Sequence, residues 1–395
     1  APLYLALLQG IADEGVTAYD GDISTTPMHY FGVGTFNVDG GIMVTPSHGP
    51  VGMTGFKIST KSARIASDTG LPDIYERMNT SFAPPKKQLP SQKLSMLPQY
   101  VNFLKRFVHI PQFGALPRVV IDAAGGATAI VLKEFLTQIR VDATKLFFDL
   151  DPDFQRHGPN PLYREAQKFV REELLNHHQD FGVLFDGDGD RAIFFDEFGG
   201  IIEPDCVGAL IAEEKLKYVS HKVVLFDINS SKRSREYVQS KKGYVELIRV
   251  GTAFFRNRLQ RDHDIIIGAE SSGHYYYPEF FNSDAAILTF IYMLNICAQS
   301  RKPMSDIVSP LHTSARSGEL NFSVEDTDRL MAAIRTAFRD GKASTVDGLA
   351  IEYPDWWFSI RPSNTESLIR LHIEADTKEL LQEKRMLLED IIRKN

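Results

Sequence analysis

Phe181-Gly-Val-Leu-Phe-Asp-Gly-Asp-Gly-Asp-Arg-Ala-Ile-Phe-Phe195 is the stretch of the sequence that decides the fold. The apolar runs at its two ends are rich in aromatic and branched residues, which is typical of buried strands. Between them, Asp186, Asp188 and Asp190 alternate with glycines, and glycine allows the backbone to turn tightly enough for three carboxylates to converge on one hard cation. The stretch therefore predicts two strands joined by a metal-binding loop.

The sequence of this loop allows two other interpretations. Glu197 falls at the twelfth position of an EF-hand loop, but Arg191 stands where that loop requires glycine, and the flanks predict strands rather than helices. We therefore reject the EF-hand. An acidic turn without a ligand stays open, although carboxylates this close repel one another and a bound cation relieves that repulsion.

Outward from this loop, short β-rich runs alternate with amphipathic stretches, the pattern of an α/β fold. Further strands are predicted at 41–44, 118–122, 222–226 and 265–267. Helices are predicted at 1–15, 129–138, 162–176, 207–217, 284–294 and 326–339. The Pro- and Lys-rich segment 83–90 interrupts both periodicities and indicates a linker, and a weaker break lies at 309–317. Three or four α/β units in series are expected.

Composition limits the classes of function. The 395 residues are 43% apolar and 24% charged, and no apolar run is long enough to cross a bilayer. The net charge of -7 disfavours nucleic acid as a partner but leaves room for a local basic site for a small anion. Cys206 and Cys297 lie in apolar surroundings, which favours a reduced, cytoplasmic compartment, while their pairing stays open.

Three more loops carry groups that are suited to chemistry. Thr45-Pro-Ser-His-Gly-Pro50 follows a strand and places a serine beside a histidine, with Lys57 downstream, so Ser47 is a candidate nucleophile. Gly268-Ala-Glu-Ser-Ser-Gly-His274 leaves a buried strand, and its Glu270 and Ser272 are candidates for binding sugar hydroxyls. Taken alone, each of these two loops is more often an ordinary turn or surface loop.

The last of these loops is Arg361-Pro-Ser-Asn-Thr-Glu366, with Arg370 beyond it. Guanidinium, hydroxyl and free backbone N–H groups on one turn suit a phosphate group. An ordinary surface loop is the alternative.

The four loops, in this order, resemble those of the α-D-phosphohexomutase family, in particular its bacterial phosphomannomutase/phosphoglucomutase branch. His157-Gly-Pro-Asn-Pro161 and Arg249-Val-Gly251 add to the resemblance, which extends over essentially the whole chain. It implies four domains around a central cleft, three related α/β domains with mixed sheets and a smaller C-terminal α+β domain. The implied limits are 1–92 (N-terminally incomplete), 93–197, 198–311 and 312–395.

The resemblance also implies roles for individual residues. Ser47 would carry the phosphate, and Asp186, Asp188 and Asp190 would hold Mg²⁺ together with a phosphoserine oxygen. The residues implied around the transferring phosphoryl group are His48, Lys57, Arg191 and His274. Glu270 and Ser272 would bind the sugar. The phosphate that is not reacting would be bound by Arg361, Ser363, Asn364, Thr365 and Arg370.

The implied activity is interconversion of hexose 1-phosphate and 6-phosphate, mannose or glucose, through a hexose 1,6-bisphosphate intermediate. The expected protein is a cytoplasmic monomer or homodimer that binds a small sugar phosphate, and neither nucleic acid nor membrane. Two alternatives stay open: a phosphoglucosamine mutase, and a catalytically weak protein that only binds sugar phosphates or regulates.

Some positions depart from the family's pattern. The family usually has Asn at the positions of Gly49 and Thr54, and His at the position of Thr252. It commonly has a basic residue at the position of Asn229 and Lys at the position of Arg256. The family's opening strand and its arginine-bearing segment would precede residue 1, so the sequence is expected to begin within the first domain. These departures are the basis of the weakly catalytic alternative.

Overall fold

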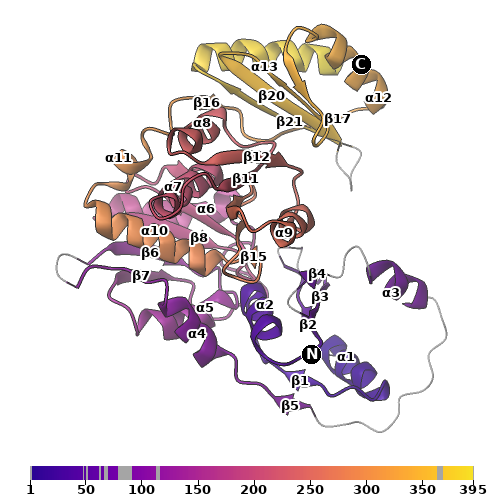
Figure 1. Cartoon of the computed structure of the whole chain (residues 1–395), viewed down its shortest axis with the longest axis vertical. Helices are drawn as coiled ribbons and strands as arrows, with labels where there is room; N and C mark the ends of the chain where they lie inside the picture. The colour runs from indigo at the N-terminus through magenta and orange to yellow at the C-terminus, as the bar shows by residue number, and fades with distance from the viewer. Residues whose placement is uncertain are drawn as a thin grey trace. The chain divides into compact units, whose positions relative to one another are not determined.

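The computed structural model describes residues 2–47, 49, 52–61, 64–65, 70–78, 91–112, 116–362 and 368–394. The chain divides into two compact units, and Figure 1 labels the helices and strands that they contain. The first contains residues 1–204, 256–263 and 272–305, and the second contains residues 205–255, 264–271 and 306–395.

The first unit is built from helices and mostly short strands. Its helices are α1 (Pro2–Asp13), α2 (Thr26–Thr35), α3 (Leu71–Met78), α4 (Leu97–Lys105), α5 (Thr128–Leu136), α6 (Arg164–Asn176) and α10 (Ala286–Ser300). Its strands are β1 (Tyr19–Asp20), β2 (Gly40–Val44), β3 (Phe56–Thr60), β4 (Arg64–Ile65), β5 (Gln92–Lys93), β6 (Arg118–Asp122), β7 (Asp142–Leu146), β8 (Phe181–Phe185), β9 (Ala192–Phe195), β10 (Ile201–Ile202), β14 (Tyr275–Tyr277) and β15 (Ser283–Asp284).

A five-stranded mixed sheet in the order β10-β9-β8-β6-β7 forms the centre of this unit. Strands β6, β7 and β8 are parallel, whereas β9 and β10 run antiparallel to their neighbours. The two strands predicted around the aspartate loop are therefore β8 and β9, which pair directly through Phe185 and Ala192. Strands rather than helices flank the loop, as expected, so the EF-hand is excluded.

Apolar side chains cover both faces of this sheet. Val170 and Leu174 of α6 pack with Leu184 and Ile193 of the sheet. The ring of Phe290 on α10 lies 6.2 Å from the ring of Phe181 and 6.3 Å from that of Phe185, centroid to centroid. Because β8 is buried on both sides, its sequence is continuously apolar and the polar loop that follows it is held on a rigid base.

The N-terminal part of the unit presents the serine loop. β2, β3 and β4 form an antiparallel three-stranded sheet, and the serine loop connects β2 to β3. α2 begins after Thr25, whose Oγ1 accepts a hydrogen bond from Met28 N at 3.1 Å, and Pro27 stands near the helix start, where the missing N–H costs nothing. The helix expected at the N-terminus is α1.

The second unit contains two sheets. Its helices are α7 (Pro204–Leu216), α8 (Lys232–Ser240), α12 (Thr327–Ala337) and α13 (Lys378–Arg393). Two further helices, α9 (Thr252–Arg261) and α11 (Met304–Val308), contain residues of both units. Its strands are β11 (Val223–Asp227), β12 (Tyr244–Ile248), β13 (Ile265–Ala269), β16 (Ala315–Arg316), β17 (Leu320–Ser323), β18 (Lys342–Ser344), β19 (Leu349–Glu352), β20 (Trp356–Pro362) and β21 (Leu368–Ala375).

Strands β12, β11 and β13 are parallel neighbours, whereas the C-terminal strands make an antiparallel sheet centred on β20 and β21. Helices α12 and α13 supply Leu330, Ile334, Leu388 and Ile392 to one core with the apolar residues of that sheet. This C-terminal part has the α+β character that was expected.

One predicted boundary is wrong. A helix was predicted at 284–294, but α10 begins at Ala286 because Ser283 and Asp284 form β15 and pair with β14, Asp284 opposite Tyr276. The other predicted helices and strands that fall on described residues are found with shifts of a few residues at their ends. The proposed linker 83–90 lies outside the described residues.

Two further expectations concern cysteine and membrane. Cys206 and Cys297 are both buried free thiols, so the open alternative of a pair between them is not realised. Within the described part of the chain, no helix has the length and apolar character that a bilayer crossing requires.

Candidate active site

The aspartate loop folds on itself around Asp186. One carboxylate oxygen of Asp186, Oδ1, accepts hydrogen bonds from the backbone N–H groups of Asp190 (3.1 Å) and Arg191 (3.2 Å), while Oδ2 accepts one from Arg191 Nε (2.9 Å). Gly189 has φ +74°, and a Cβ there would lie 2.3 Å from Thr128 Oγ1. Glycine is therefore required at this position, and the turn brings Asp188 and Asp190 to one side.

Three carboxylates meet in this loop. One oxygen each of Asp186, Asp188 and Asp190 can be chosen so that all lie within 4.8 Å of one another, and the residues are 0%, 3% and 3% exposed. Carboxylate oxygens are what Mg²⁺ and Ca²⁺ prefer as ligands, so the residues present fit a hard divalent cation. The structure thus provides the metal-type cluster that the spacing predicted.

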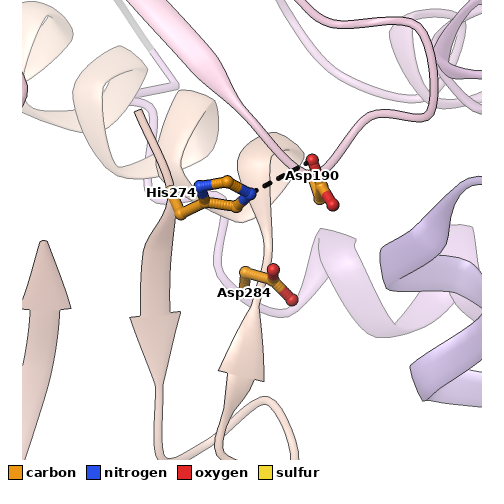
Figure 2. A group of neighbouring side chains, drawn as sticks. All are labelled: Asp190, His274 and Asp284. Carbon is orange, nitrogen blue, oxygen red and sulfur yellow. Dashed lines mark ion pairs between the residues drawn. The ribbon is translucent and has the colours of Figure 1, made fainter. Parts of the chain in front are cut away.

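His274 lies next to the last of these aspartates (Figure 2). Arg191 and His274 form an isolated antiparallel bridge, and Ala192 N donates to Gly273 O at 3.0 Å, so the loop after β13 runs alongside the start of β9. His274 Nε2 lies 3.4 Å from Asp190 Oδ1, and His274 Nδ1 is 2.8 Å from Ser272 Oγ. The backbone pairing therefore sets the histidine against the acidic cluster.

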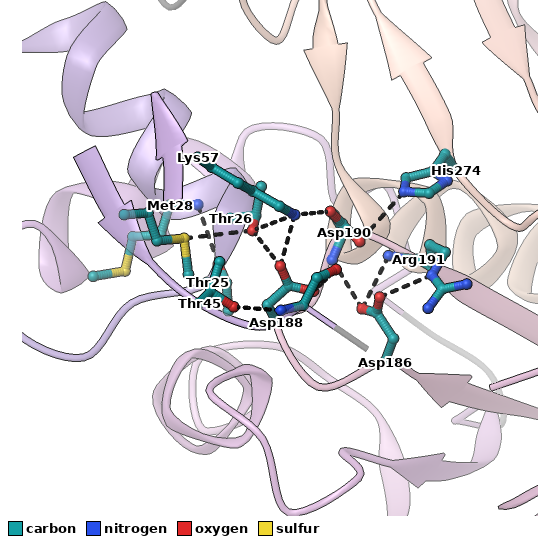
Figure 3. A network of polar contacts seen from close by, with 12 residues as sticks. Thr25, Thr26, Met28, Thr45, Lys57, Asp186, Asp188, Asp190, Arg191 and His274 are labelled. Atoms are coloured by element: carbon teal, nitrogen blue, oxygen red, sulfur yellow. Dashed lines mark hydrogen bonds and ion pairs between the residues drawn. The ribbon is translucent and has the colours of Figure 1, made fainter. Parts of the chain in front are cut away.

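Lys57 and Thr26 approach the cluster from the N-terminal part of the chain (Figure 3). Lys57 Nζ, at the end of a β3 side chain, lies 2.7 Å from Asp188 Oδ2 and 2.5 Å from Asp190 Oδ2. Thr26 Oγ1 donates to Asp188 Oδ2 at 2.8 Å, and Thr26 N donates to Asp188 O. The start of α2 is thereby fastened to the aspartate loop.

Ser47 also reaches this cluster. Its Oγ donates a hydrogen bond to Asp188 Oδ1 at 3.2 Å, and its N–H donates to Thr45 Oγ1 at 2.9 Å. Ser47 has φ +57°, a left-handed conformation that is strained for a residue with a Cβ and that is often found at functional sites. The structure thus brings Ser47, Lys57, Arg191 and His274 to the three aspartates.

The charges in the site control one another. Burial alone would lower the pKa of Lys57, but the charges of Asp190 and Asp188 outweigh burial and hold it well above the ordinary value. Burial would raise the pKa of Asp190, but the opposing effect of Lys57, followed by that of His274, keeps it well below the ordinary range. Burial and the two neighbouring carboxylates raise the pKa of Asp186. The site is thus ion-paired and desolvated.

The second unit contains the remaining predicted site residues. Glu270, at the end of β13, is 4% exposed. Close to it, Asp227 Oδ2 accepts hydrogen bonds from Ser271 N (2.8 Å) and Ser271 Oγ (2.6 Å). Burial and the charge of Glu270 raise the pKa of Asp227 to about 6.

The two predicted arginines lie opposite each other on β20 and β21. Arg361 pairs with Arg370 in the strand register, so both side chains leave the same face of the sheet. Arg361 Nη1 lies 3.9 Å from Asp347 Oδ2, and Arg370 Nη1 lies 3.6 Å from Glu319 Oε2. His48, Ser363, Asn364 and Thr365 lie outside the described residues.

Sequence reasoning missed several residues of these clusters. Thr26 contacts Asp188 across 162 positions, and the signal that could have found it is Thr25-Thr26-Pro27, a helix-start pattern that places polar groups at a fixed point. Asp347 accepts a hydrogen bond from Val250 N at 3.2 Å and lies 3.6 Å from Arg249 Nε, which joins the predicted phosphate loop to the Arg249 segment. Nothing local marks that aspartate.

Known proteins match the chain along its whole length. Four family models match, described as phosphoglucomutase/phosphomannomutase alpha/beta/alpha domains I, II and III and as the C-terminal domain of the same family, over residues 2–84, 98–199, 203–313 and 319–390 respectively. A phosphomannomutase of Methanocaldococcus jannaschii is 31% identical over 400 residues, covering 100% of this chain and 86% of that protein. A phosphomannomutase of Escherichia coli is 30% identical, covering 95% and 85%.

Solved structures agree with these matches. A crystal structure of a phosphoglucomutase/phosphomannomutase family protein from Burkholderia thailandensis superimposes with a TM-score of 0.87 at 26% identity, covering 99% of this chain and 85% of that one. The expected resemblance and the expected architecture of three α/β domains followed by a smaller C-terminal domain are confirmed. The chain belongs to the phosphoglucomutase/phosphomannomutase family.

Proposed function

We propose that this chain is a Mg²⁺-dependent phosphohexomutase that interconverts hexose 1-phosphates and 6-phosphates, mannose phosphates above all, through phosphorylated Ser47. The enzyme class is the one that the names of the relatives carry. The observation that carries the proposal is the hydrogen bond from Ser47 Oγ, on a strained loop, to a member of a buried three-carboxylate cluster.

Asp186, Asp188 and Asp190 would hold the Mg²⁺ ion with an oxygen of phosphorylated Ser47. The ion would neutralise negative charge on the phosphoryl oxygens, which is the main requirement of phosphoryl transfer. The three oxygens already lie within 4.8 Å of one another, and this supports the assignment.

The remaining charges belong to the chain itself. In this proposal Lys57 and Arg191 add positive charge around the transferring phosphoryl group, where a water-poor site strengthens their effect. His274, and His48 on the serine loop, hold or move the proton of the sugar hydroxyl. In the first half-reaction the bond between Ser47 Oγ and phosphorus breaks and a bond from the sugar oxygen to phosphorus forms, while the sugar's proton ends on Ser47.

The other groups would position the substrate. Glu270 and Ser272 bind the sugar hydroxyls, and Arg361, Ser363, Asn364, Thr365 and Arg370 bind the phosphate that is not reacting. The hexose 1,6-bisphosphate formed in the first step must turn before the second phosphate returns to Ser47, so these groups have to accept both orientations.

Assays with mannose 1-phosphate, glucose 1-phosphate and glucosamine 1-phosphate, combined with intact-protein mass measurement, test this function. We expect turnover of the mannose and glucose substrates with Mg²⁺, and a fraction of the protein carrying one phosphoryl group. Ser47→Ala should lose both the phosphoryl fraction and nearly all turnover, whereas Ser220→Ala, at an exposed position, should lose neither.

The alternatives give different results. Turnover of the glucosamine substrate alone would identify a phosphoglucosamine mutase. Binding of sugar phosphates without turnover or phosphoprotein would indicate a passive binder, and full activity of Ser47→Ala would refute the proposed mechanism.

A further inference from the structure

A second cluster lies on the other side of Asp190. Its Oδ2 faces Lys57 at 2.5 Å, whereas its Oδ1 faces His274 Nε2 at 3.4 Å. One ligand atom each of Asp190, His274 and Asp284 lie within 4.8 Å of one another. The two oxygens of one carboxylate therefore serve two different groups of side chains.

The pairing of β14 with β15 explains why His274 and Asp284 converge. Asp284 pairs with Tyr276 in antiparallel register, so the two side chains leave the same face of the hairpin. His274 stands two positions before Tyr276, and side chains two apart in an extended segment point to one face. Figure 2 shows the histidine and Asp284 on neighbouring segments beside Asp190.

Asp284 is the group that this arrangement leaves unexplained. It is 1% exposed, and its Oδ1 accepts no hydrogen bond from any residue that the structure describes. Asp190 Oδ1 is buried as well, and its ion-pair partner is His274 Nε2 at 3.4 Å. A buried carboxylate oxygen without a donor is costly, so a ligand that contacts Asp284 Oδ1 together with Asp190 and His274 would stabilise the site.

The donor set indicates what that ligand is. His274 Nδ1 lies 2.8 Å from Ser272 Oγ, which fixes the ring and directs Nε2 toward the two carboxylates, an arrangement typical of metal-binding histidines. One imidazole nitrogen with two carboxylates suits Zn²⁺ and related transition metals, whereas Mg²⁺ prefers oxygen alone. The cluster Asp186, Asp188 and Asp190 offers only oxygen.

We propose that Asp190, His274 and Asp284 form a second metal site, selective for Zn²⁺-type ions, which adjoins the three-aspartate cluster and shares Asp190 with it. Metal binding at this site involves only side chains of the protein, so it can be measured without any catalytic activity. A consequence, which rests on the proposed function, is that an ion on His274 Nε2 removes this histidine from proton transfer, so Zn²⁺ inhibits the Mg²⁺-supported reaction.

Co²⁺, a spectroscopic substitute for Zn²⁺, tests the site in the full-length metal-free chain. We expect a Co²⁺ absorption spectrum with nitrogen coordination, lost in His274→Gln and shifted to at least tenfold higher Co²⁺ concentrations in Asp284→Asn. Asp188→Asn, which changes only the oxygen cluster, should keep the spectrum. Circular dichroism of each variant checks that it is folded.

Anomalous diffraction from wild-type crystals containing Zn²⁺ supplies a test that needs no variant. An ion bound by His274 Nε2 and Asp284 supports the proposal, and an ion held only by the three aspartates overturns it. Unchanged Co²⁺ binding in folded His274→Gln and Asp284→Asn would overturn it as well. A chain that binds Zn²⁺ here without mutase activity would leave the site standing and refute the proposed function.

Discussion

Lys57 Nζ lies 2.7 Å from Asp188 Oδ2, inside a cluster whose carboxylates also fit a divalent cation. The same ammonium group contacts Asp190 Oδ2. Because Lys57 contacts two of the three carboxylates, Lys57 and a metal ion compete for the same negative charge. If Lys57 acts on the transferring phosphoryl group as proposed, it has two opposing effects, one on metal affinity and one on phosphoryl transfer.

Replacing Lys57 separates these effects. In Lys57→Met the apparent affinity for Mg²⁺ should rise by about tenfold or more, since two unit charges at ~4 Å interact by about 4 kcal/mol in a partly screened site. Turnover should fall, because the transferring phosphoryl group loses the stabilising positive charge of the lysine. Titration calorimetry gives the first quantity and steady-state kinetics the second. Lys61→Met, at an exposed position near the end of β3, is the matched control. Weaker Mg²⁺ binding in Lys57→Met would contradict the competition.

Removing a carboxylate tests the metal cluster from the other side. Asp188→Asn takes away one of three anionic oxygens, so Mg²⁺ should bind more weakly and activity should fall in parallel, with partial recovery at high Mg²⁺. Asp149→Asn, which changes an exposed aspartate of the first unit, should change neither Mg²⁺ affinity nor activity. Undiminished turnover of the wild-type enzyme after treatment with a chelator would show that the aspartate loop is merely structural.

Much of this fold is visible in local sequence. The continuous apolar run before Asp186 predicts β8 because a strand buried on both faces has no polar alternation, and the buried pattern of β8 bears this out. The predicted start of α10 is wrong because Asp284 pairs with Tyr276 of β14 and so belongs to β15. The stabilisation from this strand pairing is not visible in the hydrophobic periodicity of the helix. Local patterns therefore give elements, while pairing decides their ends.

The site divides in the same way. The spacing of Asp186, Asp188 and Asp190 is a local property, and it predicted the carboxylate cluster directly. The contact of Thr26 with Asp188, and the partnership of Asp284 with His274, depend on segments that only the tertiary fold brings together. A single sequence carries no signal for such pairs.

A buried pair in the first unit predicts how stability depends on pH. His157 Nε2 lies 3.2 Å from Asp122 Oδ1. Burial lowers the pKa of His157, but the hydrogen bond and charge of Asp122 outweigh burial and raise it above 6.5. Burial also raises the pKa of Asp122. Through His157 the folded state binds more protons than the unfolded state, so the contribution of this histidine is complete below about pH 6.5 and is lost as the pH rises through its folded pKa.

Urea unfolding of the wild type and of His157→Gln, from about pH 6 to about pH 9, measures this effect. The free energy of unfolding of the wild type should fall more steeply with pH than that of His157→Gln. His178→Gln, which changes an exposed histidine, is the matched control and should keep the wild-type slope. Equal slopes for wild type and His157→Gln would show that this pair does not titrate differently on unfolding.

The division of labour in the second unit gives the last prediction. Arg361 is proposed to bind the phosphate that is not reacting, so Arg361→Ala removes a charge-assisted contact worth roughly 1.5–3 kcal/mol, or about 10- to 150-fold in kcat/KM. Both half-reactions should suffer, and the loss should be equal for mannose and glucose substrates, because the phosphate is common to both. Glu270→Gln should instead change the ratio of kcat/KM between the two sugars.

Steady-state kinetics of both variants with both sugar phosphates measures these losses. Arg335→Ala, which removes an exposed arginine from α12, controls for the change in net charge. Arg361 Nε is buried and has no hydrogen-bond partner among the described residues. A phosphate that reaches this guanidinium would therefore supply an acceptor for Nε without breaking a hydrogen bond of that atom. If Arg361→Ala altered the preference between sugars and left affinity for phosphate intact, the role assigned to this loop would be wrong.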